Sequence, residues 1–146
     1  MSQLKLVALD NQDLEIISAH VQDAVLKVAD LSYTASEKRF IVPMNRFAWE
    51  AGKRGLFFKR NERRQAVMHF EGVRAVKSTG FSRAKGDEVL SLLAIRFEPG
   101  PEAPAGVIEL TFSGEAAIRL DVDYIEARMA DLGGAWEALS RPQHKG

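Results

Sequence analysis

The fold is decided by residues 107–122, which read VIELTFSGEAAIRLDV. Every second side chain is apolar on each side of Ser113-Gly114, whereas the side chains between them are mostly polar. The apolar positions are Ile108, Leu110, Phe112, Ile118, Leu120 and Val122. A period of two is typical of a half-buried strand, and a Ser-Gly pair between two such runs indicates a turn. The stretch therefore predicts a β-hairpin.

The same alternation extends upstream to residue 25. Residues 25–33 and 39–49 flank a polar connection, which predicts a second hairpin, and Pro43 predicts that its second strand is bent or lies at an edge. In residues 65–79 the apolar phase slips at Gly72. We predict a β-bulge there, within one long bent strand, because glycine tolerates a positive φ.

The strand before the decisive hairpin is predicted from Val89 to Phe97. Val89, Leu93, Ile95 and Phe97 are expected to share one face, and Pro99-Gly100-Pro101 ends the strand because proline has no N–H for the ladder.

Helical spacing is found near both ends of the chain. Residues 11–24 carry apolar side chains on one side after Asp10, whose carboxylate predicts an N-cap. A second helix is predicted to begin at Asp123 and to stop at Gly133-Gly134, with residues 141–146 frayed.

These elements predict an α+β fold in a single domain over residues 1–146. We expect a mostly antiparallel, bent sheet or barrel of about seven strands, with a helix near the start and a C-terminal capping helix. This element order resembles that of the pleckstrin-homology superfold. A superfold carries many functions, so the resemblance implies no activity.

Composition excludes several classes of site. The 146 residues contain no cysteine, so a disulfide framework, a thiolate metal cage and a catalytic thiol are excluded. No apolar run reaches the ~20 residues that cross a bilayer. We expect a cytoplasmic protein without a membrane partner, a metal or a cofactor.

The net charge of zero conceals a strong asymmetry. Twenty bases balance 20 acids, yet residues 38–85 hold 13 bases and three acids, a charge of +10, and the remainder carries −10. A clustered basic surface attracts phosphates and acidic surfaces whatever the total charge is. Alternatively, the two parts neutralise each other within the fold or between the copies of a homo-oligomer.

The densest basic stretch is residues 53–64, where six bases accompany two phenylalanines. Cations that contact phosphates and rings that stack on bases are the combination used by single-stranded nucleic acid binders. We therefore predict a non-catalytic binding or adaptor module that docks an anionic partner, either an acidic protein surface or RNA. The predicted contact residues are Lys53, Arg54, Phe58, Lys59, Arg60, Arg63 and Arg64. Arg39, Arg46 and Trp49 could extend this surface.

A small enzyme is the alternative hypothesis. His69, Glu71 and Arg74 are titratable residues around the predicted bulge, a place where proteins often re-aim side chains. The chain has no Gly-x-Ser-x-Gly motif, and its three histidines are not spaced to hold a metal from one helix face.

Several stretches resemble a small bacterial family known only as a domain of unknown function. They are residues 4–10, 13–25, 39–40, 46–50, 70–76, 92–97 and 130–133. The resemblance covers nearly the whole chain. It implies a single domain of a cytoplasmic bacterial protein and carries no activity or site assignment.

Overall fold

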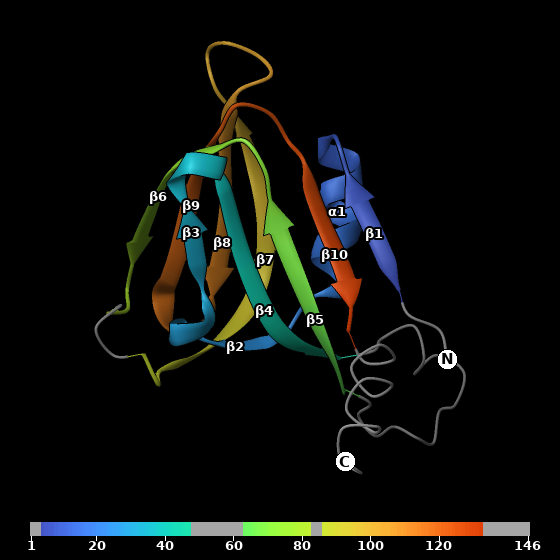
Figure 1. The fold of residues 1–146 in the computed structure, drawn as a ribbon, viewed down its shortest axis with the longest axis vertical. Helices are drawn as coiled ribbons and strands as arrows, with labels where there is room; N and C mark the ends of the chain where they lie inside the picture. The colour runs from blue at the N-terminus through green and yellow to red at the C-terminus, as the bar shows by residue number, and fades with distance from the viewer. Residues whose placement is uncertain (1–3, 48–62, 83–85, 133–146) are drawn as a thin grey trace.

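The computed structural model describes residues 4–47, 63–82 and 86–132 (Figure 1). The strands are β1 (Lys5–Ala8), β2 (Val25–Lys27), β3 (Ser32–Thr34), β4 (Arg39–Phe47), β5 (Arg63–Phe70), β6 (Val73–Thr79), β7 (Val89–Pro99), β8 (Gly106–Phe112), β9 (Ala116–Val122) and β10 (Ala127–Asp131). The helical elements are α1 (Asn11–His20) and the 3₁₀ turns η1 (Val28–Asp30), η2 (Ala35–Glu37) and η3 (Ser113–Glu115). No helix in the described residues is long and apolar enough to cross a membrane.

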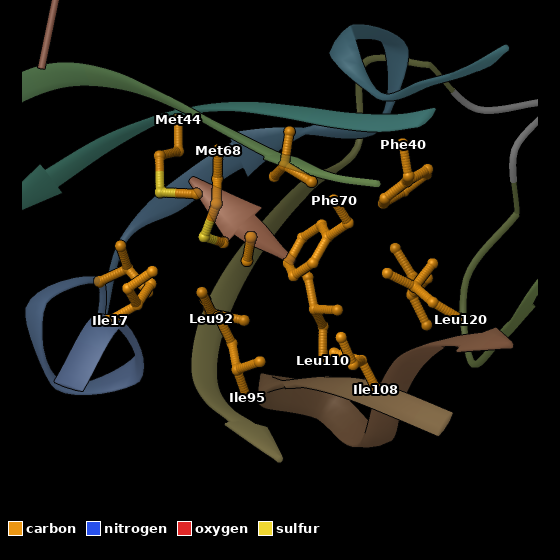
Figure 2. Packing of buried hydrophobic residues seen from close by; sticks show 14 of the residues in the cluster. Ile17, Phe40, Met44, Met68, Phe70, Leu92, Ile95, Ile108, Leu110 and Leu120 are labelled. Atoms are coloured by element: carbon orange, nitrogen blue, oxygen red, sulfur yellow. The ribbon is translucent and has the colours of Figure 1, made fainter. Parts of the chain in front are cut away.

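The strands form one bent sheet in the order β1-β10-β5-β4-β2-β7-β8-β9-β6, with β3 also beside β4. Every pairing is antiparallel. β7 links the two halves, because it pairs with β2 at its start and with β8 further on. The core fills the space between the halves: in Figure 2, Met68 and Phe70 of β5 point toward Leu92, Ile108 and Leu110.

The sheet does not close into a barrel, because its hydrogen-bonded path ends at β1 and β6. The two edges lie on opposite sides of the molecule (Figure 1). α1 packs against β1 and β7 and so covers one of the two seams. There the Ser18 hydroxyl accepts a hydrogen bond from the Ile95 N–H at 2.9 Å. The mostly antiparallel α+β class is confirmed, but the sheet has ten strands instead of about seven.

The decisive hairpin is confirmed. β8 and β9 pair from Gly106 opposite Val122 to Phe112 opposite Ala116, joined by η3 with Gly114 at a φ of 76°. α1 is also confirmed, although it ends at His20 instead of Ala24. The Asp10 carboxylate caps it by accepting from the Asp13 N–H at 2.8 Å.

The helix predicted to begin at Asp123 is wrong. Residues 127–131 form β10, which pairs with β1 on one side and β5 on the other. Ala127, Met129 and Asp131 are buried in alternation, and without β10 the described β1 and β5 would each lose their shared neighbour. Pairing with two strands outweighs the local helical spacing. The expected tail, residues 141–146, lies outside the described residues.

The single strand predicted over residues 65–79 is also wrong. The chain turns at Gly72, with a φ of 71°, and passes from β5 to β6, which pair with different neighbours. Gly72 has the positive φ that was predicted, but the bulges lie in β6 after Val73 and in β7 after Leu92. The second bulge explains why Val89 and Leu93 are 57% and 46% exposed while Ile95 is buried.

Pro43 does not mark an edge strand. β4 lies between β5 on one side and β2 and β3 on the other. β3 pairs with residues 39–41 of β4 and β2 pairs at Asn45, so Pro43 falls in the gap between them. This position needs no N–H for a ladder, which is why a proline fits in a central strand.

Candidate functional site

The predicted basic surface is described only in part. Arg63 and Arg64 begin β5, whereas Lys53, Arg54, Phe58, Lys59 and Arg60, like Trp49, lie outside the described residues. Arg63 is exposed and stands opposite Phe47 in the β4–β5 register. Its guanidinium carbon lies 5.1 Å from the centroid of the Phe47 ring, which is cation–π distance.

A hollow of about 300 Å³ opens beside this pair. Its lining includes Asn45 and Gln65, which face each other two residues along the same strands from Phe47 and Arg63. Val89 and Leu132, which are 57% and 36% exposed, add apolar surface to the lining. The hollow therefore joins amide and apolar groups next to a stacked cation.

Arg46, which was expected to extend the basic surface, is buried. Its Nε and Nη2 donate to the two carboxylate oxygens of Asp131 at 2.7 and 2.9 Å, and both side chains are at most 2% exposed. Asp131 also accepts from the Leu4 N–H at 3.2 Å. Because β4 and β10 bring the two residues together, this bidentate pair joins segments 85 residues apart.

Asp123 neutralises two further bases of the basic segment. Its carboxylate lies 3.2 Å from Lys38 Nζ and 3.1 Å from Arg74 Nε. Seven of the 13 bases between residues 38 and 85 lie in the described residues, and four of them form ion pairs with carboxylates. Part of the +10 segment is thus compensated within the fold.

His69 and Glu71 meet on the outer face of β5, opposite the buried Met68 and Phe70. His69 Nδ1 donates to Glu71 Oε2 at 2.8 Å, since an ionised carboxylate only accepts, and Arg39 Nε donates to the same oxygen at 2.9 Å. Burial would raise the pKa of Glu71, but the hydrogen bonds from Arg39 and His69 outweigh it and place this pKa below its ordinary value. The Glu71 hydrogen bond and charge raise the pKa of Arg39.

This cluster is not assembled like an active site. Arg74, the third residue of the enzyme hypothesis, pairs with Asp123 instead of joining His69 and Glu71. The hollows of about 300 and 220 Å³ are lined by other residues. In the described parts of the chain, no three histidine or acidic side chains are placed to share a metal ion.

A second hollow, of about 220 Å³, lies in the open seam between β3 and β6. Tyr33 bridges one end of this seam, because its hydroxyl donates to the Val73 carbonyl at 2.8 Å. Sequence reasoning missed this hollow. Its walls come from strands that are distant in the chain, and no local pattern shows that β3 and β6 are neighbours.

Fold and surface together define a small α+β domain built on an open antiparallel sheet, with ion-paired surface clusters and shallow hollows. The chain belongs to a family described as "Protein of unknown function (DUF2948)", whose model matches residues 4–144. The resemblance found in the sequence is thereby confirmed. No curated protein and no solved structure matches the chain.

Proposed function

We propose that the domain is a non-catalytic binding module that docks an acidic protein segment on the outer end of β4 and β5. The observation that carries the proposal is the stacked pair of Arg63 and Phe47 beside the hollow of about 300 Å³. An exposed cation held against a ring is a fixed contact for a carboxylate, and the hollow accepts an apolar anchor from the same partner.

An acidic protein is favoured over RNA. A nucleic-acid interface needs several bases free to neutralise phosphates. Among the described bases of the segment, Lys38, Arg39, Arg46 and Arg74 are already paired with carboxylates. One arginine next to amide and apolar groups fits a mixed protein surface better than a phosphate backbone. We also propose a cytoplasmic location, which the absence of cysteine supports.

The test measures binding of a labelled peptide of glutamates around a single central leucine, with a labelled oligouridine in parallel. Arg63→Glu should weaken peptide binding roughly tenfold, because it replaces an attraction by a repulsion. The matched control is Arg96→Glu, which makes the same charge change at an exposed position of β7 and should leave affinity unchanged.

Two results would contradict the proposal. One is peptide binding that Arg63→Glu leaves unchanged. The other is oligouridine binding that is tighter than peptide binding and loses about one unit of salt dependence when Arg60, Arg63 and Arg64 are replaced together by alanine, as an RNA interface requires.

A further inference from the structure

The two edges of the sheet differ in what covers them. β1 is packed by α1, whereas β6 pairs only with β9 among the described strands. An uncovered edge strand presents a row of backbone groups that can pair with another chain. The edge of β6 is therefore where this fold can accept an additional strand.

The hydrogen bonds identify which backbone groups of β6 are unpaired. The Asp123 N–H donates to the Gly72 carbonyl at 2.9 Å, so Val73 and Val122 face each other without bonding directly. The groups of Val73 accordingly point away from β9: its N–H donates to the Lys38 carbonyl at 2.9 Å, and its carbonyl accepts from Tyr33.

The same alternation applies further along β6. Val76 and Ser78 stand opposite Leu120 and Ile118, which have the same orientation in β9 as Val122 because they lie two and four residues before it. The N–H and carbonyl groups of Val76 and Ser78 thus point away from β9. Within the described residues, no strand of the sheet pairs with this edge.

The hollow of about 220 Å³ lies directly beside these groups. Val76 and Ser78 line it together with the apolar side chains of Leu31, Phe40 and Phe81. The volume is below the roughly 300–1,000 Å³ of small-molecule sites. It matches instead an apolar side chain or two carried by a strand whose backbone pairs with β6.

Charge on the outer face restricts the incoming strand further. Lys77 is exposed on β6 and stands opposite Arg119 of β9. Arg119 is held by Glu98 at 3.1 Å and Glu109 at 3.3 Å, whereas Lys77 has no carboxylate partner among the described residues. A strand beside β6 places its outward side chains next to Lys77, where an acidic residue is favoured.

We propose that the edge of β6 binds an extended peptide in which apolar residues alternate with acidic ones. The backbone pairs with Val76 and Ser78, the apolar side chains enter the hollow, and the acidic side chains meet Lys77. The strand spans about five residues, roughly 17 Å. This site is separate from the Arg63 surface and does not depend on the function proposed above.

The test uses a labelled peptide in which leucine alternates with glutamate, and a scrambled peptide of the same composition. Amide hydrogen exchange followed by NMR should show rapid exchange at Val76 and Ser78 and slow exchange at Lys77 and Thr79, which face β9. The alternating peptide should slow exchange at Val76 and Ser78 at least about tenfold, and the scrambled peptide should not.

Two variants locate the binding. Val76→Phe fills the hollow and Lys77→Glu reverses the outer charge; each should weaken peptide binding about tenfold. If Val76→Phe lowers the melting temperature, the exposed Lys77→Glu variant decides alone. Arg96→Glu and Arg63→Glu are controls and should leave this binding unchanged.

Protection of Val76 and Ser78 by both peptides, or by neither, would overturn the proposal. Binding of the alternating peptide that Lys77→Glu does not weaken would overturn it too. If Arg63→Glu alone abolishes the binding, the peptide occupies the other surface. That result supports the proposed function and contradicts a site on β6.

Discussion

Arg46 shows why counting charges along a sequence misplaces some of them. The sequence places it in a basic segment, and the structure places it at 0% exposure against Asp131. Its position in β4 is inward-facing like those of Val42 and Met44, but alternation alone does not reveal that an acid from the far end of the chain meets it. The partner of a buried charge depends on strand order, which local patterns do not contain.

Breaking this ion pair should be costly. Arg46→Met leaves the Asp131 carboxylate buried without its bidentate donor, so we expect the free energy of unfolding to fall by about 3–5 kcal/mol. Arg74→Met removes a half-exposed contact with Asp123 and should cost no more than about 1 kcal/mol. Urea denaturation measures both. A loss below about 1 kcal/mol for Arg46→Met would show that water reaches Asp131.

Glu71 makes stability depend on pH in acid. Its pKa is lower in the folded protein than the ordinary value of about 4.3, so its contribution is complete above that value and is lost as the pH falls through the folded pKa. The stability difference between the wild type and Glu71→Gln should be constant above about pH 5 and shrink below it. Denaturant titrations at several pH values measure this difference. Glu102→Gln, at an exposed position, is the control; a gap that widens in acid would contradict the prediction.

Among the elements, strands with strict alternation were predicted well and those defined by tertiary pairing were not. β8 and β9 alternate without interruption and match the prediction. β10 carries Ile125, Met129 and Leu132 at helical spacing, yet it is a strand because β1 and β5 pair with it. The Arg63 part of the candidate site followed from composition, whereas the β3–β6 seam required knowing which strands are neighbours.

The bulge in β7 depends on α1. Where the register shifts after Leu92, the Ile95 N–H donates to the Ser18 hydroxyl. Ser18→Ala leaves this partly buried donor without an acceptor, so the free energy of unfolding should fall by about 1–3 kcal/mol. Ser113→Ala, at an exposed turn position, should change it by less than about 0.5 kcal/mol. Equal effects of the two substitutions in thermal denaturation would mean that another group accepts from Ile95.

In the whole molecule, the opposite charges of the sequence meet across the bent sheet. Asp123 and Asp131 come from the acidic C-terminal part, and they pair with Lys38, Arg74 and Arg46 of the basic middle. The fold thus brings the two parts of the chain together at β4, β10 and the turn that precedes β10. This internal pairing supports the first of the two ways in which the net charge of zero could arise.

Internal compensation predicts that the protein is a monomer at every salt concentration. Assembly through acidic helices on a basic strand face required two such helices, and residues 127–131 of the second are a strand in the sheet. Light scattering should give the monomer mass both at about 10 mM salt, where charges act over about 30 Å, and at about 1 M, where they act over about 3 Å. A mass that is larger at low salt and falls to the monomer value at high salt would show that the charges also compensate between copies.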